Sequence, residues 1–482
     1  MTGDDLCFLS GGEAARLIAA RQLSPVELVD AILARVEAVQ PHINAFTVVR
    51  AEAARAEAKA AEAAVGNGDA LGLLHGVPFT VKDMIDVAGE RITWGSYMFE
   101  NNVPAEDAPV VARLKAAGGI VLGITNMPEC GPKGVTDNPL WGTTRNPWNL
   151  EHTPGGSSGG AGAALASGCG ALAIGTDRAG SVRIPASCCG VVGLKTTAGA
   201  WPNTDVLDFF DKANVIGPLT RTVSDGALMM SVVTGPDERD PLSLGTRRRD
   251  FGAAADARGD MKGMRVAWTS KVGNTEVDHD TLAQCEAAVE ALGGLGAEVE
   301  EIDLDLLASV HILFVLVGAR LHAAYGDKLE EFGERLDPAL RQAIEDGARW
   351  TGADVFEAAF ARVKLFEDIE ALFSGFDLIA TPTLTMPTIP IDQFSWDPVT
   401  VNGKVLRSPR YDWLPYSHPF NHTGHPAISV PAGWTSEELP VGLQLVAPWH
   451  AEERLLGAAA ELEAVRPWAH RRPPLLEKLA AA

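Results

Sequence analysis

Two serines, each in a turn of small residues, are the side chains whose setting favours covalent chemistry. Ser157 lies in the run Gly-Gly-Ser-Ser-Gly-Gly (155–160), and Ser181 ends the run Gly-Thr-Asp-Arg-Ala-Gly-Ser (175–181). Glycine lets the backbone approach a ligand closely, and a series of backbone N–H groups can stabilise an oxyanion. A serine hydroxyl is a weak nucleophile unless a neighbouring base accepts its proton. The pattern is typical of a hydrolase, and it requires a base.

Lys82 is a candidate for that base. It ends the short apolar run 76–82, which predicts a strand, and Phe79, Val81 and Met84 surround it in the sequence. Burial lowers the pKa of a lysine by up to about 3–5 pH units from a reference near 10.4, which makes the neutral amine available near neutral pH. A neutral amine can act as a general base. A lone lysine after a strand is more commonly a solvated surface charge, so both interpretations stay open at this point.

Three other interpretations of the segment 153–197 are weaker. A flexible Gly/Ser linker would not contain an apolar run such as Leu172-Ala173-Ile174. A phosphate-binding loop needs a lysine directly after its glycines, and none follows Gly160. A Gly-x-Ser-x-Gly turn with Ser158 as nucleophile must follow a strand, and residues 149–154 do not read as one. A pair of cooperating serines fits the segment better.

The elements that position these residues indicate an α/β fold. Ser10 and Ser24 precede two helices as N-caps, and Asp107-Ala108-Pro109 begins another. The alternation of strands with helices indicates βαβ units, so we expect one mixed, mostly parallel sheet surrounded by helices. In a helix predicted at 355–373, one stripe typical of a core-facing surface carries Phe356, Ala359, Phe360, Val363 and Phe366.

Composition narrows the class of protein. Of the 482 residues, 46% are apolar and 21% are charged, which is ordinary for a globular protein with a large core. The formal net charge of −23 argues against binding of nucleic acid or an anionic membrane through the surface. The sequence shows no signal peptide, long apolar run or metal-ligand spacing. We therefore expect a cytoplasmic protein without a metal, a cofactor, or a nucleic-acid or membrane partner.

The serine-rich motifs resemble those of the amidase signature family. The resemblance covers most of the chain and implies a single α/β domain over 1–482, with a signature core at about 75–200 and a variable substrate-pocket region at about 384–420. The runs that carry it are 155–160, 175–177, 180–186 and 189–195, together with Lys82-Asp83, Thr125-Asn126-Met127-Pro128-Glu129, Asn146-Pro147-Trp148, Thr381-Pro382-Thr383 and Gly424-His425-Pro426-Ala427.

The resemblance also implies a Ser–Ser–Lys catalytic arrangement. Carried over position by position, Ser181 is the nucleophile, Ser157 is the bridging serine after a cis peptide bond, and Lys82 is the terminal base. Neither serine turn contains a histidine, which leaves Lys82 as the best base among the motif residues. The family's oxyanion hole maps to the backbone N–H groups of Arg178, Ala179, Gly180 and Ser181.

Two positions beside Ser181 depart from the family's common pattern. Many members have an uncharged residue in place of Arg178 and glycine in place of Ala179. A positive φ at alanine would cost about 1 kcal/mol, so we expect a negative φ at Ala179. Arg178 is either a ligand for a substrate carboxylate or, more commonly, a structural charge; Asp177 and Arg183 are expected to brace the turn. The run 179–187 and the segment 467–473 are similar to the branch that contains nylon-oligomer (aminohexanoate cyclic-dimer) hydrolases.

The sequence therefore predicts an amidohydrolase that cleaves the carbon–nitrogen bond of a small, apolar or aromatic amide through an acyl-enzyme. Gly131, Trp141 and Phe209 are predicted to bind the substrate. The amide and water are the expected partners, and a homodimer is typical of the family. Two alternatives stay open: a component of an amidotransferase that acts on glutamyl- or aspartyl-tRNA, and a hydrolase of a carbamate or urea derivative.

Overall fold

A mixed sheet of eleven strands runs through the protein. The structure is a computed structural model that describes residues 2–256, 261–394, 396–407 and 409–481. The strand order in the sheet is β1-β3-β2-β6-β8-β7-β14-β15-β11-β9-β10. Its strands are β1 Phe46–Val49, β2 Pro78–Lys82, β3 Ile120–Thr125, β6 Leu172–Asp177, β7 Val192–Lys195, β8 Val215–Thr220, β9 Arg265–Trp268, β10 Glu298–Glu301, β11 Leu378–Pro382, β14 Ala427–Trp434 and β15 Pro440–Val446. Outside it, β4 Asp137–Asn138 pairs with β5 Gly142–Thr143, and β12 Thr400–Val401 pairs with β13 Lys404–Val405.

The expected mixed sheet is confirmed, but parallel pairing is confined to two parts of it. β2 pairs in parallel with β3 and β6, and β9 pairs in parallel with β10 and β11. The other neighbouring strands of the sheet are antiparallel. Short connections such as the one between β14 and β15 permit only antiparallel pairing. The sheet is therefore parallel around Lys82 and largely antiparallel between β6 and β11.

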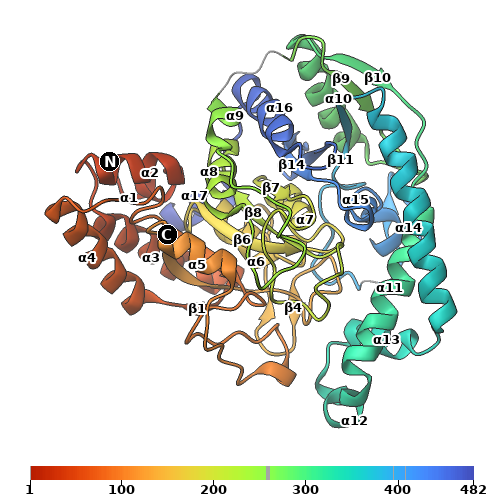
Figure 1. The fold of residues 1–482 in the computed structure, drawn as a ribbon, viewed down its shortest axis with the longest axis horizontal. Helices are drawn as coiled ribbons and strands as arrows, with labels where there is room; N and C mark the ends of the chain where they lie inside the picture. Colours follow the sequence, from red (N-terminus) through yellow and green to blue (C-terminus); the bar gives the residue numbers. More distant parts are fainter. Residues whose placement is uncertain (1, 257–260, 395, 408, 482) are drawn as a thin grey trace.

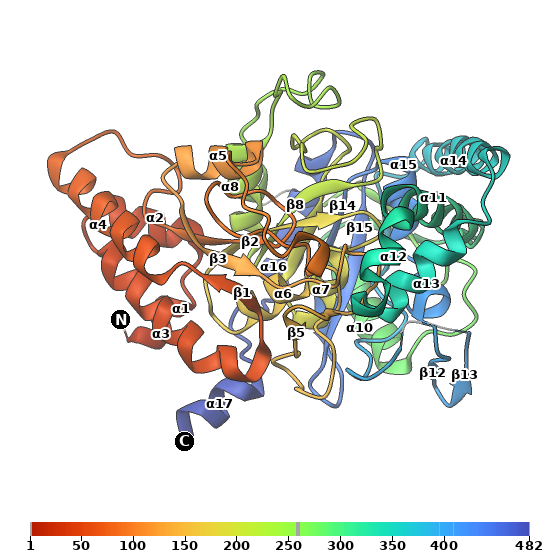
Figure 2. The same cartoon turned by 90° about the horizontal axis from the view of Figure 1, so that it is seen from below.

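Helices surround this sheet on its faces and at its ends (Figures 1 and 2). The α-helices are α1 Gly3–Cys7, α2 Gly11–Ala19, α3 Pro25–Ile43, α4 Ala51–Asn67, α5 Pro109–Ala116, α6 Gly159–Ala166, α7 Arg183–Cys189, α8 Val223–Val233, α9 Gly252–Asp256, α10 His279–Gly294, α11 Ala308–Tyr325, α12 Leu329–Phe332, α13 Pro338–Gly347, α14 Gly352–Phe373, α15 His418–Thr423, α16 Glu452–Val465 and α17 Pro474–Ala481. Shorter helical turns are η1 Tyr97–Phe99, η2 Gly326–Lys328, η3 Gly333–Arg335 and η4 Pro409–Trp413.

The helix starts expected from capping residues are present. Ser10 Oγ accepts a hydrogen bond from the backbone N–H of Glu13 at 3.1 Å. Ser24 Oγ accepts from the N–H groups of Val26 and Glu27 at 3.1 and 3.3 Å, and Pro25 is the first helical residue. Such side chains satisfy N–H groups that have no partner inside the helix.

Different helices form the two ends of the molecule, and α6 and α7 lie near its centre. Figure 1 shows α1 to α4 at one end and α11 to α14 at the other, with the sheet between them. Every residue of α6 and α7 is buried. The small residues of α6 permit close packing, since a Cβ added to Gly160 would lie 2.5 Å from the backbone nitrogen of Asn126. This packing fixes the serine turn from which α6 begins.

Most of the apolar stripe predicted on α14 does not face the core, although Phe366 stacks on the buried ring of His425. Phe356, Phe360 and Val363 are 65%, 67% and 58% exposed. The buried residues of this helix are Ala358, Leu365 and Ile369. Helix α14 lies at the edge of the molecule (Figure 2), so it buries only a narrow face. The spacing of the aromatic residues identified the opposite face, which is exposed.

The segment Ala308–Arg335 is long and apolar enough to cross a membrane by length and composition alone. It consists of α11 and the short helices that follow it. α11 contacts α13, α14 and α15, and it contributes Leu313, Val317 and Arg320 to the wall of a pocket. In its most apolar window 39% of the residues are buried inside the protein, so the segment packs partly against the rest of the chain.

Candidate active site

The parallel strands β2 and β6 bring Lys82 and Thr176 together. Phe79, Thr80 and Val81 pair in register with Leu172, Ala173 and Ile174. The two strands therefore end at the same edge of the sheet, where Lys82 is the last residue of β2 and Thr176 is the penultimate residue of β6. Chemistry at the carboxyl ends of neighbouring strands is a common property of α/β folds.

Lys82 is fully buried and hydrogen-bonded to two hydroxyl groups. Its Nζ donates to Ser157 Oγ at 2.6 Å and to Thr176 Oγ1 at 2.8 Å. Burial lowers the pKa of Lys82 to about 7, and the negative charge of Asp177 opposes this effect in part. Lys82 therefore contacts Ser157 directly, and a pKa of about 7 makes its neutral amine available at physiological pH.

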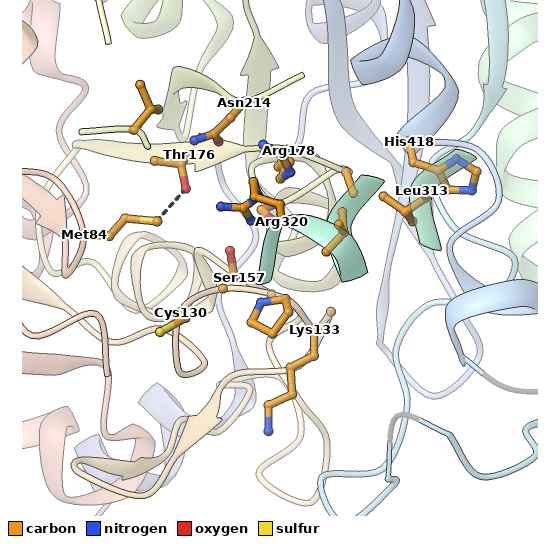
Figure 3. Close-up of a pocket in the computed structure, with 18 of the residues that line it drawn as sticks. Met84, Cys130, Lys133, Ser157, Thr176, Arg178, Asn214, Leu313, Arg320 and His418 are labelled. Atoms are coloured by element: carbon orange, nitrogen blue, oxygen red, sulfur yellow. Dashed lines mark hydrogen bonds between the residues drawn. The ribbon is translucent and has the colours of Figure 1, made fainter. Parts of the chain in front are cut away.

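Thr176 orients the amine of Lys82. The Thr176 hydroxyl donates to Met84 Sδ at 3.1 Å, as Figure 3 shows, so its oxygen is the acceptor toward Lys82. A neutral amine has two N–H donors and one lone pair. With one N–H directed to Thr176, the lone pair can accept the hydroxyl proton of Ser157 over the same 2.6 Å contact.

The Ser157 turn is closely packed. The peptide bond between Gly156 and Ser157 is cis, as the resemblance implied. A Cβ added to Gly156 would lie 2.8 Å from the backbone of Val135, and one added to Gly131 would lie 3.4 Å from Ser157 Oγ. Small residues on both sides therefore allow the backbone to approach the bridging hydroxyl.

A buried ion pair braces the turn that carries Ser181. Asp177 accepts hydrogen bonds from Arg183 Nε and Nη2, each at 3.0 Å, and both side chains are fully buried. It also accepts from Asn421 Nδ2 at 2.8 Å. Although burial acts in the opposite direction, Arg183 and Lys195 hold the pKa of Asp177 well below its usual range. Asp177 and Arg183 therefore support the turn, as expected.

The backbone N–H groups of the turn divide into two sets. The N–H of Gly180, which the resemblance placed in the oxyanion hole, instead donates to Asp177 Oδ1 at 2.7 Å. The N–H groups of Arg178, Ala179 and Ser181 donate to no other described residue. Gly180 has φ +115, whereas Ala179 is not among the described residues with positive φ, which confirms the expectation for Ala179. Of the N–H groups that the resemblance assigned to the oxyanion hole, those of Arg178, Ala179 and Ser181 are the ones that Asp177 leaves available.

Ser157 and Ser181 line the same pocket, and Figure 3 shows Ser157 in its wall. Ser181 is 8% exposed, and its hydroxyl forms no hydrogen bond with the described residues. The pocket wall also contains apolar side chains from distant parts of the chain, which are Met84, Trp94, Ile184, Leu313, Val317 and Leu414. The predicted pocket region 384–420 contributes Leu414 and His418; its residues 395 and 408 lie outside the described residues.

Two arginines lie on one side of the pocket. Arg178 forms an ion pair with Asp211. Arg320 from α11 lies next to Arg178 in Figure 3. Burial and the charge of Arg178 lower the pKa of Arg320 to about 10, so its guanidinium stays protonated at neutral pH.

Of the three predicted substrate-binding residues, Gly131 lines the pocket, whereas Trp141 and Phe209 do not. Gly131 lines the pocket beside Cys130, whose φ is 54. Trp141 does not line it, because its indole Nε1 donates to Thr93 Oγ1 at 2.8 Å and Arg91 lies 4.4 Å above its ring. Phe209 does not line it either: it is 41% exposed and borders a separate, smaller pocket.

Sequence reasoning missed three residues of this site: Thr176, Asp211 and Arg320. Thr176 lies inside a signature motif, and only the register of β2 with β6 shows that it faces Lys82. Asp211 lies in a loop without a motif. Arg320 lies on an apolar helix far along the chain. Its position as the single charged residue among apolar ones is the feature of the sequence that could have indicated a functional role.

Known proteins resemble this chain over nearly its full length. The family described as Amidase matches residues 27–456. The chain is 41% identical over 475 residues to an acylamidase from Rhodococcus erythropolis, with 98% of each chain covered. It is 35% identical over 493 residues to one of the chains of a glutamyl-tRNA(Gln) amidotransferase from Roseiflexus castenholzii, with 97% of this chain and 98% of the relative covered.

Solved structures agree with these relatives. A bacterial aryl acylamidase of the amidase signature family has a TM-score of 0.90 at 28% identity and covers 98% of this chain and 99% of its own. A 6-aminohexanoate cyclic dimer hydrolase has a TM-score of 0.86 at 32% identity with the same coverage, which agrees with the branch named from the sequence. The chain belongs to the amidase family and is an amidase signature enzyme that hydrolyses amide bonds.

Proposed function

We propose that the protein hydrolyses a small amide through an acyl-enzyme on Ser181, with Ser157 as proton relay and Lys82 as base. The contact of 2.6 Å between Lys82 Nζ and Ser157 Oγ carries this proposal, because it joins a buried amine with a pKa of about 7 to a serine on the pocket wall. A hydroxyl nucleophile needs such a proton acceptor.

Acylation transfers one proton along this chain of groups. Ser181 Oγ attacks the amide carbonyl while its proton passes to Ser157 Oγ, and the hydroxyl proton of Ser157 passes to the neutral amine of Lys82. The negative charge on the carbonyl oxygen is stabilised by backbone N–H groups drawn from Arg178, Ala179 and Ser181, which have no other described acceptor. The products are a tetrahedral intermediate and a protonated Lys82.

The same groups release the amine and complete the turnover. Lys82 returns the proton through Ser157 to the leaving nitrogen, the carbon–nitrogen bond breaks, and an ester on Ser181 remains. Water then attacks this ester and gives its proton to the relay. The ester bond breaks, Ser181 regains its hydrogen, and the carboxylic acid leaves.

The pocket wall supports an apolar or aromatic part in the substrate. Met84, Trp94, Ile184 and Leu414 line the space beside the serines. Burial of apolar surface contributes roughly 25 cal/mol per Å². Acylamidase and aryl acylamidase are the names of similar proteins, and they favour N-acyl amides, including anilides, as substrates to assay first.

The amidotransferase alternative has less support. The amidotransferase relative is 35% identical to this chain, against 41% for the acylamidase. A carbamate or urea carbonyl would also suit a serine nucleophile, and such compounds belong in the same substrate panel.

The proposal also includes a cytoplasmic location and a homodimer. Light scattering of the purified protein tests the dimer.

Release of amine from neutral anilides by the purified chain tests the proposed function. We expect turnover by the wild type and loss of turnover in Ser181→Ala, with unchanged folding by circular dichroism. Activity that requires added partner proteins and glutamine would instead support the amidotransferase alternative. Unchanged anilide turnover in Ser181→Ala would contradict the proposed nucleophile.

A further inference from the structure

Arg320 places an unpaired positive charge on the wall of the active-site pocket. Its guanidinium forms no hydrogen bond or ion pair with the described residues, and its Nε is buried without a partner. The other cations of the pocket wall are paired. Arg178 pairs with Asp211, and Lys133 pairs with Asp137 and Asp337 at 2.8 and 2.5 Å. Among the described residues of the pocket wall, Arg320 is therefore the cation without a counter-ion from the protein, and it is available to bind a ligand.

The described acidic groups of the pocket form no hydrogen bond or ion pair with Arg320. Asp211 pairs with Arg178, although its charge also raises the pKa of Arg320 in part. Burial raises the pKa of Asp205 to about 7, and its carboxyl accepts from the backbone N–H of Asp86 at 3.1 Å. Asp208 is exposed at the rim and accepts from the N–H of Phe210 at 2.9 Å. Burial lowers the pKa of His418 to about 3, which leaves it neutral.

A partly buried guanidinium without a counter-ion is unfavourable unless a ligand supplies the missing acceptor. The guanidinium presents a planar set of N–H donors that matches the two oxygens of a carboxylate. Figure 3 shows Arg320 on the same side of the pocket as Arg178, and Ser157 lines the same pocket. Leu313 and Val317, which also come from α11, give this part of the pocket an apolar wall.

We propose that Arg320 binds a carboxylate of the substrate, and that the enzyme prefers amides whose acyl or amine part carries a carboxylate a few carbon atoms from the scissile bond. Dicarboxylic acid half-amides and N-acyl amino acids are members of this class. The proposal rests on the proposed function, since it places the scissile carbonyl at Ser181. Arg320 then acts as a specificity-determining residue and takes no part in proton transfer.

Matched pairs of substrates test this preference. The first pair is glutaric acid mono-4-nitroanilide and its uncharged methyl ester, in which the acyl part differs in charge. The second pair is N-valeryl-4-aminobenzoate and its methyl ester, in which the amine part differs. In at least one pair we expect the anion to have the higher kcat/KM. Arg320→Met should lower kcat/KM for that anion about 10- to 100-fold, mainly through KM, and change the ester little.

Two further variants make the result specific. Arg320→Lys keeps the charge but loses the planar donor set, and it should retain part of the preference. Arg341→Met removes an exposed positive charge from α13, where Arg341 pairs with Glu345 outside the pocket. This control should leave the ratio of anion to ester unchanged, which separates local recognition from the effect of net charge.

Calorimetry with the Ser181→Ala variant separates this proposal from the proposed function, because binding needs no turnover. Tighter binding of an anionic anilide than of its ester, lost when Arg320→Met is added, supports the carboxylate site even if hydrolysis fails. Equal effects of Arg320→Met on anion and ester in both pairs, in both kinetics and binding, would overturn the role of Arg320. Hydrolysis of the esters would then still support the amidase mechanism.

Discussion

Lys82 has a low pKa because its side chain reaches from the end of β2 into the interior and is fully buried there. The amine is fully buried, and its hydrogen-bond partners are the neutral hydroxyls of Ser157 and Thr176. A neutral hydroxyl compensates a buried charge less well than a carboxylate does. The neutral amine, which the proposed mechanism requires, is therefore accessible at physiological pH.

The pH dependence of kcat/KM should report this ionisation. The folded pKa of Lys82 is lowered to about 7, so the amine is protonated and inactive below this pH and neutral and active above it. We expect kcat/KM for a neutral anilide to rise about tenfold per pH unit below 7 and to level off above it. Lys82→Ala should lose roughly 10²- to 10⁴-fold in rate together with this inflection. If the inflection persists in Lys82→Ala, it belongs to another group, such as Lys195.

Thr176→Val tests whether the second hydroxyl orients the amine. Valine removes the acceptor that lies 2.8 Å from Lys82 Nζ, so kcat should fall about tenfold with little change in KM, and the inflection near pH 7 should shift. Thr80→Val is the matched control, because Thr80 is a buried threonine on β2 whose hydroxyl has no partner among the described residues. The control should keep full activity and equal or greater stability, by up to about 1 kcal/mol. Equal kinetic effects of the two variants would contradict the orienting role.

Single residues were predictable where a local motif surrounds them. Ser157, Ser181 and Lys82 lie in short runs whose glycines and apolar neighbours are themselves informative. Arg320 was not predictable, because its position in the pocket depends on how α11 packs, long after the signature motifs. Trp141 was assigned to substrate although its indole has a structural partner in Thr93. Aromatic residues in loops either bind substrate or support the loop, and the sequence alone does not distinguish these two roles.

At the scale of one element, the turn between β6 and α7 determines where Ser181 points. Gly180 has φ +115 and donates its N–H to Asp177, while Ser417 Oγ donates to the carbonyl of Ala179 at 2.6 Å. An added Cβ at Gly180 would lie 2.6 Å from Ser417 Cβ and 2.9 Å from Ile184 Cδ1. Both the conformation and the available space therefore require glycine at this position.

Gly180→Ala should lower the free energy of unfolding by about 2–4 kcal/mol and reduce kcat/KM more than a hundredfold, because the turn must move. Chemical denaturation and anilide kinetics measure the two effects. Adding Ser417→Gly removes the steric conflict with the serine side chain but leaves the unfavourable φ and the close approach to Ile184, so stability should recover only in part. Ala179→Gly, at a position without positive φ, should be mild by comparison. Wild-type activity in Gly180→Ala would contradict the requirement for this turn geometry.

Elements were predicted best where caps or short apolar runs delimit them. The starts of α2 and α3 and the strands around Lys82 follow from such signals. The direction of pairing between β6 and β11 was not predictable, because it depends on how connections return to the sheet. The exposed stripe of α14 shows a similar difficulty: periodicity identifies a face, but only packing shows whether that face is covered.

At the scale of the whole molecule, Glu463 links helix α16, near the C-terminus, to the start of α8. Its carboxylate accepts from the backbone N–H of Val223 at 2.9 Å. Burial and the charge of Asp225 raise the pKa of Glu463 from 4.5 to about 7. Because the folded pKa is raised, the stability that protonated Glu463 contributes is fully present below about pH 4.5 and is lost as the pH rises through 7.

Glu463→Gln keeps an oxygen acceptor for Val223 and removes the buried negative charge. The variant should match the wild type near pH 4.5 and exceed it by about 1–2 kcal/mol at pH 8, as measured by denaturant unfolding over this range. Glu290→Gln, at an exposed position on α10, is the control and should show no such pH dependence. If the difference in free energy of unfolding between Glu463→Gln and the wild type is the same from pH 4.5 to 8, the raised pKa is contradicted.

The central claim is that Ser181 carries the acyl group, and trapping that intermediate tests it most directly. The enzyme would be quenched with acid during turnover of an N-acyl 4-nitroanilide, digested, and analysed by tandem mass spectrometry. The acyl group should be found on Ser181 in the wild type. In Ser157→Ala, the same adduct should form more slowly, because the relay is removed. An acyl group on Ser157 or Ser158, with Ser181 unmodified during rapid turnover, would contradict the mechanism.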